Sequence, residues 1–408
     1  MSLAVQLRAP MPNLAAEELW DRIREYLETQ ANDALRECHE GMDEQGEYLV
    51  ASLHPGEEGV EFHLAGDEFI ASATTSNAGP GYHEYVLTLL NGLAKSLGLS
   101  SPSIADPTGF AASGDRAALE ASMEAFLREV CQKIAIDLEA RPKRVQIGMT
   151  MDSIFQFGEG VLTPMGPQSW TWAEDVARGQ RPGHEYFSWW NADQDAEYFL
   201  NRALCLMWSE VRWKPPGTEE EVAVLEECLR SLEAAHDLDP DRPYPYREWA
   251  EIRELLELDP QDFPDVEDGP LVGYRRGWVR EALAAGWSIL LPGNMDGAWE
   301  EGAWSGGNQE LTVSFQSFRK DGPKQEEWTE EAMRGMRLRG DEILEFDQDG
   351  LTGKACIFED SDDDGSFFQL DGRVARTGNL AVLTVNFNEE DQRESAEKIW
   401  RSLRVSRN

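Results

Sequence analysis

The chain has 408 residues, and its 77 acidic against 37 basic side chains give a formal net charge of −40. A surface this negative repels nucleic acid and anionic membranes and attracts basic partners, so we expect no nucleic-acid binding. A hydrophobic content of 41% and 14 tryptophans are typical of a folded protein and argue against a disordered chain. Solubility, or a halophilic habitat, would explain the same charge without any partner.

The cysteine pattern and the hydropathy bear on the compartment. The cysteines are odd in number and widely spaced, which predicts reduced thiols rather than a disulfide framework. Residues 1–12 lack the apolar run of a signal peptide, and nowhere do about 18 apolar residues follow one another. We therefore expect a cytoplasmic protein that needs no cofactor and inserts into no membrane. The cysteines are Cys38, Cys131, Cys205, Cys228 and Cys356.

Residues 1–150 read as a sandwich-like α+β domain. The clearest strand is 60–64, where Val60, Phe62 and Leu64 alternate with polar residues and so predict one buried and one solvated face. Further elements are expected as strands at 48–53, 68–74 and 144–150, and as amphipathic helices after residue 13, after the loop 76–81 and over 115–138.

Residues 151–270 read as a helical region rich in tryptophan. Six of the 14 tryptophans lie within 168–216, around an expected helix over about 193–212. This helix is apolar over more than one stripe, which is typical of a helix enclosed on several sides, so we expect Trp208 in the core. The alternative interpretation is an aromatic-lined pocket or binding face. Because Trp189 and Trp190 precede the helix in an expected loop, they are candidate binding residues.

A second helix of this region is strongly acidic. It begins after residue 218 and contains Glu219, Glu220, Glu221, Glu226 and Glu227. Carboxylates at this density attract a basic protein, so these five residues are the predicted contact with a partner. A stretch rich in Pro, Asp and Gly at 259–270 is the predicted linker to the next domain.

Residues 271–408 read as an antiparallel β-sheet packed by helices. The segments 311–315 and 381–387 alternate strictly between apolar and polar residues, which predicts two strands with one face in a core. A helix is expected near 326–336, between strands. The last expected helix begins after Asn388 and presents Ile399 and Trp400 to the sheet.

This third domain resembles a known fold family. The segment Gly-Trp-Ser-Ile-Leu-Leu-Pro at 286–292, the two alternating strands and the closing Ile-Trp-Arg-Ser-Leu at 399–403 are similar to the Mog1/PsbP-like fold. That group includes bacterial effector chaperones and adaptors of secretion systems. The resemblance implies a binding module, carries no catalytic residues, and does not extend to residues 1–270.

One acidic segment has the spacing of a calcium-binding loop. Asp360, Asp362, Asp364 and Asp371 occupy positions 1, 3, 5 and 12, with Gly365 at position 6. Position 12 is Asp rather than the usual bidentate Glu, and the flanking segments are predicted strands rather than helices. We therefore favour an acidic hairpin turn over a metal site.

Two further groups of residues suggest chemistry. The loop 77–81, which contains Gly79 and Gly81, can offer backbone amides to an anion at the start of a helix, although it lacks the Lys-Ser/Thr of a phosphate-binding loop. A helix cap explains the same residues. His63 and His83 lie in one predicted domain and can meet as an acid–base pair.

The sequence thus predicts a three-part α+β protein that is not an enzyme. Its expected function is to sequester a basic protein partner, in the manner of an immunity protein or an effector chaperone or adaptor. Two alternatives stay open. One is an unidentified hydrolase with a site around His63 and His83, and the other is a structural subunit of an assembly.

Overall fold

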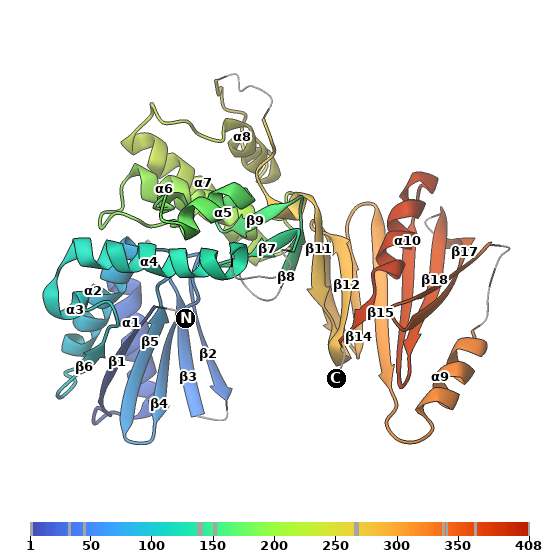
Figure 1. The fold of residues 1–408 in the computed structure, drawn as a ribbon, viewed down its shortest axis with the longest axis horizontal. Coiled ribbons are helices and arrows are strands. Elements are labelled where there is room, and N and C mark those ends of the chain that lie inside the picture. The colour runs from blue at the N-terminus through green and yellow to red at the C-terminus, as the bar shows by residue number, and fades with distance from the viewer. Residues whose placement is uncertain are drawn as a thin grey trace. The chain divides into compact units, whose positions relative to one another are not determined.

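The computed structural model describes residues 3–31, 34–43, 46–136, 142–149, 153–264, 269–336, 339, 342–362 and 365–406. The chain forms two compact units, each shown in Figure 1. Unit 1 comprises Met1–Met149, Gly158–Val211 and Pro215–Gly273, and unit 2 comprises Thr150–Phe157, Arg212–Lys214 and Tyr274–Asn408. Helices make up 37% and strands 31%, in four sheets, which confirms the α+β class. The further division of unit 1 at residue 150 stays a prediction.

The first sheet of unit 1 has six antiparallel strands in the order β2-β3-β4-β5-β1-β6. Side chains of β4 alternate as predicted, because Val60 and Phe62 are fully buried while Glu61 faces outward. Two helices pack on the buried face and leave the other face open. The bounds are β1 (Ala4–Pro10), α1 (Ala16–Gln30), β2 (Glu37–Asp43), β3 (Gly46–Ser52), β4 (Val60–Ala65), β5 (Glu68–Thr74), α2 (Pro80–Ser96) and β6 (Ser103–Ala105).

A smaller three-stranded sheet and two helices follow in unit 1. The strand order is β10-β9-β7, and α4 packs against α5 over a separate apolar cluster that contains Met123 and Trp172. Asp115 caps α4 by accepting a hydrogen bond from the Ala118 amide. The bounds are α3 (Phe110–Ser113), α4 (Arg116–Ala135), β7 (Arg144–Gln146), β9 (Gly160–Thr163), β10 (Gly166–Gln168), α5 (Trp170–Ala177) and a short 3-10 turn, η2 (His184–Tyr186).

Three helices complete unit 1: α6 (Ala196–Ser209), α7 (Glu219–Leu238) and α8 (Tyr246–Leu255). The predicted helix over 193–212 is confirmed as α6, which begins after the cap Asp195. Most of α6 is buried, as its apolar sequence requires. The prediction that Trp208 lies in the core needs correction, because its ring is only partly buried. The ring lies against Gly166 of β10. Among the described residues, no helix combines the length and the apolar character that crossing a membrane requires.

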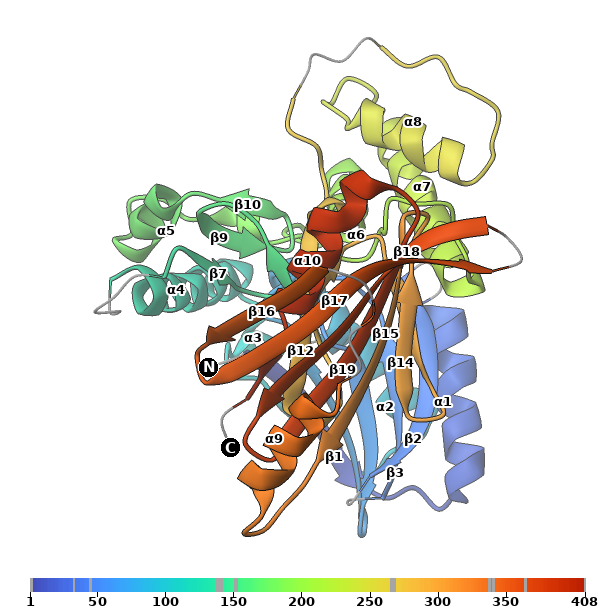
Figure 2. The same cartoon turned by 90° about the vertical axis from the view of Figure 1, so that its right-hand side faces the viewer.

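Unit 2 contains two antiparallel sheets, of which the larger is clear in Figure 2. The strand orders are β20-β12-β11-β8 and β13-β14-β15-β19-β18-β17-β16. The bounds are β8 (Ser153–Gln156), η3 (Tyr274–Arg276), β11 (Trp278–Ala282), η4 (Ala284–Gly286), β12 (Trp287–Pro292), β13 (Asp296–Glu300), β14 (Ala303–Gly307), β15 (Leu311–Arg319), α9 (Gln325–Arg334), β16 (Glu342–Gln348), β17 (Leu351–Asp362), β18 (Gly365–Arg376), β19 (Asn379–Phe387), η5 (Glu390–Gln392), α10 (Arg393–Arg401) and β20 (Arg404–Val405).

The closing helix α10 packs on the large sheet of unit 2 as predicted. Ile399 and Trp400 are fully buried in the core of this unit. The indole of Trp400 lies directly over Gly372 of β18, where a β-carbon would come within 2.5 Å of the ring. Only glycine therefore fits beneath this tryptophan, and the strand and the helix approach each other closely at this point.

Candidate functional site

Helix α7 carries the predicted acidic contact on one of its faces. The Thr218 hydroxyl caps the helix and accepts a hydrogen bond from the Glu221 amide at 3.3 Å. Glu219 and Glu220 are exposed in the first turn, where carboxylates also favour the positive end of the helix dipole. Glu226 is exposed about two turns later and lies 3.8 Å from Arg230. These side chains are available to a partner.

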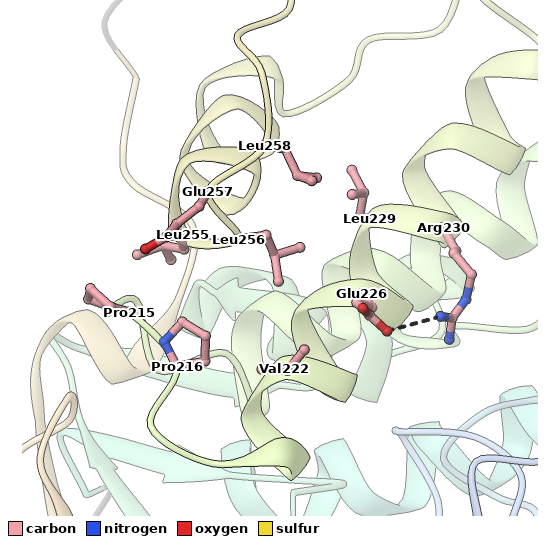
Figure 3. Close-up of a pocket in the computed structure, with 10 residues that line it drawn as sticks. All are labelled: Pro215, Pro216, Val222, Glu226, Leu229, Arg230, Leu255, Leu256, Glu257 and Leu258. Carbon is pink, nitrogen blue, oxygen red and sulfur yellow. Dashed lines mark ion pairs between the residues drawn. The ribbon is translucent and has the colours of Figure 1, made fainter.

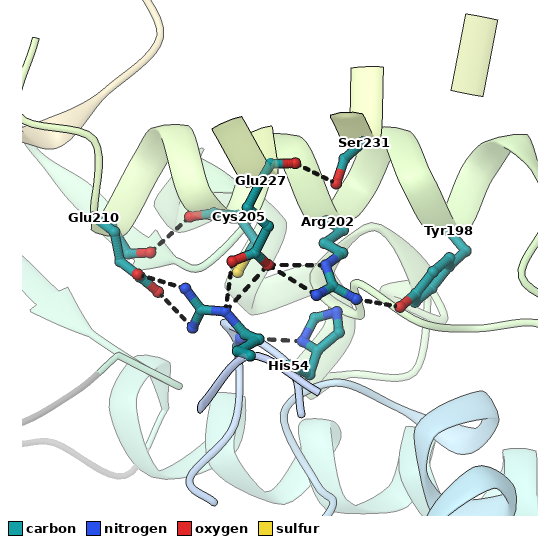
Figure 4. A network of polar contacts seen from close by, with 10 residues as sticks. His54, Tyr198, Arg202, Cys205, Glu210, Glu227 and Ser231 are labelled. Atoms are coloured by element: carbon teal, nitrogen blue, oxygen red, sulfur yellow. Dashed lines mark hydrogen bonds and ion pairs between the residues drawn. The ribbon is translucent and has the colours of Figure 1, made fainter. Parts of the chain in front are cut away.

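Glu227 corrects the prediction, because its carboxylate belongs to a buried network (Figure 4). It accepts hydrogen bonds from Arg36 Nε at 2.9 Å and from Arg202 Nε at 3.0 Å. The two terminal nitrogens of Arg36 also donate to the two carboxylate oxygens of Glu210, at 3.0 and 2.7 Å. Arg202 also donates to the Tyr198 hydroxyl at 2.7 Å. Glu227 therefore holds helices α6 and α7 to the segment before β2 and does not face a partner.

The burial of this network decides its energetic role. The side chains of Arg36, Glu227 and Arg202 are only 14%, 13% and 5% exposed. Burial by itself would lower the pKa of Arg36, but Glu210 and Glu227 outweigh it and the net shift is upward. Removing one partner would leave a buried charge without compensation, which costs far more than breaking an exposed pair.

His54 lies beside the network in the loop between β3 and β4. It is fully buried, and its Nδ1 accepts a hydrogen bond from the Gly56 amide at 3.0 Å. Burial, together with the charges of Arg202 and Arg36, holds the pKa of His54 well below its usual value. The ring is therefore neutral, and its role is to accept the hydrogen bond of the Gly56 amide inside the fold.

The predicted anion-binding loop contacts a carboxylate of the protein itself. Glu57 Oε1 accepts hydrogen bonds from the backbone amides of Asn77 at 2.5 Å and Ala78 at 2.8 Å. Burial nevertheless raises the pKa of Glu57 to about 8. An external phosphate would have to displace this side chain. Helix α2 begins at Pro80, and no side chain caps its first turn in this described segment. The alternative prediction of a helix cap is therefore also wrong.

The glycines of this loop are explained by a close approach of the chain. Gly81 donates its amide to Trp189 O at 3.1 Å, and a β-carbon at Gly81 would lie 2.0 Å from Asn191 O. Gly79 adopts a φ of +113°, and a β-carbon there would lie 2.9 Å from Phe187. Backbone contact with residues 187–191 accounts for both positions without a ligand.

The two candidate tryptophans have different environments. Trp189 is fully buried and packs on Tyr198, with ring centroids 4.3 Å apart, so it cannot meet a partner at the surface and that prediction is wrong. Trp190 is partly exposed and stacks on His184 at 3.8 Å. His184 Nε2 in turn lies 2.8 Å from Glu124 Oε1. The Trp190 ring also contacts Phe187, with centroids 5.4 Å apart, so only part of it is exposed.

The structure does not bring His63 and His83 together. His63 is on the open face of the first sheet, 3.5 Å from Glu61, in a groove of about 530 Å³. His83 is on α2, which packs on the opposite face, and is fully buried. It contacts Thr75 at 2.8 Å and Asp106 at 3.3 Å, and burial lowers its pKa. The predicted acid–base pair is therefore wrong.

The acidic segment 360–371 lies in the β17–β18 hairpin. Asp360 pairs with Phe367, whereas Asp371 pairs with Cys356 four positions further along. At about 3.3 Å per residue, Asp371 is roughly 13 Å along the strand from Phe367, too far to share a cation with Asp360. Its carboxylate instead accepts hydrogen bonds from Gln369 and Thr384. Asp362 closes the described part of β17, and Asp364 lies outside the described residues. No group of three metal-ligating side chains occurs where the structure is described.

A groove of about 550 Å³ lies between α7 and the end of α8 (Figure 3). We call it the α7–α8 groove. This groove was not predicted from the sequence, although the run Leu-Leu-Glu-Leu at 255–258 next to a helix end is an available signal. Its rim contains Glu226, Arg230 and Glu257. The apolar lining comprises Pro215, Pro216, Val222, Leu229, Leu255, Leu256 and Leu258.

Comparisons with known proteins give a likeness to solved structures only. No family model and no curated protein matches the chain. A crystal structure from Bacteroides thetaiotaomicron is similar over 30% of this chain and 46% of that one, with 8% identity and a TM-score of 0.25. The solution structure of cyanobacterial PsbP from Synechocystis is similar over 31% of this chain and 91% of that one, with 12% identity and a TM-score of 0.17. The chain spans about half the length of the first of these structures. The distant PsbP likeness agrees with the sequence resemblance and carries no information on function.

Proposed function

We propose that the protein is a non-catalytic binding protein that sequesters a basic protein partner on the exposed side of α7. One observation carries this proposal. The segments 215–230 and 254–258 contain one basic residue, Arg230, and, apart from the buried Glu227, six acidic ones. These six are Glu219, Glu220, Glu221, Glu226, Glu254 and Glu257.

Two physical properties suit this surface to capture a basic protein. Clustered exposed carboxylates speed the diffusional encounter with a cationic partner, and a net charge of −40 extends that attraction. The buried Arg36–Glu227 contact fixes α7, so its acidic face is rigid before a partner arrives. A preorganised surface loses less conformational entropy on binding.

The proposed role is that of an immunity protein or an effector chaperone or adaptor in the cytoplasm. Such proteins hold a toxic or secreted protein in an inactive complex, and a basic partner needs an acidic surface of this kind. Trp190, with part of its ring exposed, is a secondary candidate contact.

The test is a triple charge reversal with a matched control. The variant Glu219→Lys, Glu220→Lys, Glu226→Lys changes two exposed first-turn residues and one member of an i,i+4 pair with arginine. The control Glu326→Lys, Glu327→Lys, Glu330→Lys does the same on α9 of unit 2, where Glu330 lies 3.6 Å from Arg334. Both triples change the net charge equally.

The measurement is capture of basic proteins from the native cytosol at low salt, followed by elution with salt. We expect the α7 triple to lose a captured protein that the α9 triple retains. The association rate with that protein should fall steeply between low and physiological salt. Equal capture by the two triples, or an association rate independent of salt, would contradict the proposal.

A further inference from the structure

The α7–α8 groove places an apolar surface inside the acidic region. Figure 3 shows Leu256 and Leu258, at the end of α8, facing Val222 and Leu229 of α7. Leu258 is 42% exposed. A cluster of aliphatic side chains that remains open to solvent and is rimmed by charged residues is typical of an interaction site.

The backbone at the end of α8 is strained in a way that builds this groove. Glu257 adopts a φ of +55°, the left-handed conformation that glycine normally occupies after a helix. The Leu258 amide donates to Arg253 O at 2.9 Å, which turns the chain back over the last turn of the helix. This conformation is unfavourable for a residue other than glycine. The turn that it forms places Leu258 over the groove and the Glu257 carboxylate on its rim.

We propose that the α7–α8 groove binds the apolar face of a basic amphipathic helix of the partner. This inference rests on the proposed function and names the partner's chemistry. Aliphatic residues spaced i, i+3, i+4 and i+7 on such a helix would fill the groove between Val222 and Leu258. Lysine or arginine residues on its flanks would meet Glu226 and Glu257.

The charges around the groove select among possible occupants. A fatty acid or another apolar anion would meet two rim carboxylates, Glu226 and Glu257, and one cation, Arg230, which is already paired with Glu226. An uncharged apolar helix would fill the groove but leave those carboxylates unused. A cationic amphipathic helix can contact the apolar floor and also meet Glu226 and Glu257, which outnumber the single rim cation Arg230. The size of the groove lies within the range of roughly 300–1,000 Å³ known for ligand clefts.

The probe is a fluorescent synthetic helix with leucines on one face and lysines on the other. One control peptide keeps the lysines and replaces the leucines by serine, and a second keeps the leucines and replaces the lysines by glutamate. We expect the full-length wild-type protein to bind the first peptide at least about tenfold more tightly than either control, measured by fluorescence anisotropy. Equal binding of the two lysine peptides, or of the two leucine peptides, would overturn the inference.

Two matched variants test whether the peptide binds in the α7–α8 groove. Leu258→Ser removes one exposed leucine from the groove, and Leu238→Ser removes a 58% exposed leucine from the far end of α7. We expect Leu258→Ser to weaken binding of the leucine–lysine peptide about tenfold and Leu238→Ser to leave it unchanged, with both proteins melting like wild type. Equal affinities of the two variants would exclude the groove.

The outcomes separate this inference from the proposed function. If the α7 triple loses the basic protein while Leu258→Ser retains both that protein and the peptide, the charge-based function stands and the groove is not its site. If the α7 triple still captures the protein, the proposed function fails, whatever the peptides do.

Discussion

The Glu227 carboxylate lies 2.9 Å from Arg36 Nε and joins two parts of unit 1 that are 191 residues apart in the sequence. Its neighbour Glu226 points outward to Arg230 on the same helix. Two adjacent glutamates of α7 thus have unrelated tasks, since one holds the helix in place and the other faces solvent.

The same substitution should therefore change the stability of unit 1 much more at Glu227 than at Glu226. Glu227→Gln removes the charge that compensates Arg36 and Arg202, so it should lower the free energy of unfolding of unit 1 by about 3 kcal/mol. Glu226→Gln should change it by no more than about 0.5 kcal/mol, because exposed pairs contribute little. Urea unfolding followed by tryptophan fluorescence measures both. A Glu227→Gln protein as stable as Glu226→Gln would show that the network does not stabilise the fold.

The adjacent tryptophans give a second contrast. Trp189→Ala should cost about 3–5 kcal/mol, because it leaves a cavity among Tyr82, Tyr85 and Tyr198. Trp190→Ala removes a partly exposed ring and should cost about 1 kcal/mol. Thermal melting of the two purified variants compares these two losses of stability. A reversed order of stability would refute the assigned burial.

Glu57 should make the protein less stable as the pH rises from about 4.5 to about 8. The pKa of Glu57 is about 8 in the folded protein against an ordinary 4.5, so the folded state binds more protons between these values. Stability is therefore lost as the pH rises through this window, by about 5 kcal/mol at most. Unfolding free energies of wild type and Glu57→Gln, measured from pH 5 to pH 9, should diverge in slope, with the variant flatter. Parallel slopes would mean that Glu57 titrates normally.

His54 should give the opposite trend in acid. Burial and the two arginines hold its pKa below 6.5 in the folded protein, so below about pH 6.5 the unfolded chain binds a proton that the folded one refuses. Stability is lost as the pH falls. The variant His54→Asn, whose side-chain oxygen can still accept from the Gly56 amide, should show less loss between pH 6.5 and pH 5 than wild type. An unchanged slope would assign the effect to other groups.

Calcium should leave the melting temperature nearly unchanged at millimolar concentration. Asp371 is held by Gln369 and Thr384 in the middle of β18, away from the hairpin end. Differential scanning calorimetry with and without calcium tests this. A large rise in melting temperature that disappears in Asp360→Asn would show that the hairpin end binds the ion.

Local patterns in the sequence were sufficient for several elements and their faces, although not for β1 (Ala4–Pro10), which pairs with β5 and β6 within the first sheet. The alternation in β4 and β19 follows from a sheet with one buried face, and Phe62 and Leu383 are indeed fully buried. A helix over about 193–212 was expected, and α6 begins at Ala196 because the Asp195 side chain accepts a hydrogen bond from the Tyr198 amide three residues on. Both features depend on neighbours in the chain, which is why they can be predicted.

The roles of the charged residues could not be predicted in the same way. Glu226 and Glu227 look alike in the sequence, and only the position of Arg36 distinguishes them. One local signal was available, because Arg202 lies within an otherwise apolar helix and a buried arginine requires a partner. The α7–α8 groove likewise depends on the left-handed turn at Glu257, which helix propensity does not indicate.

The separation between Arg36 and Glu227 has a consequence for synthesis of the chain. Residues 4–105, which form the whole first sheet, leave the ribosome long before Glu227. At roughly 5–20 residues per second, the 191 intervening residues take roughly 10–40 s to make. During that interval the nascent sheet carries Arg36 without Glu227, and its other partner, Glu210, is made only shortly before Glu227. The network that holds α7 to the segment before β2 therefore cannot be completed until α7 has been made.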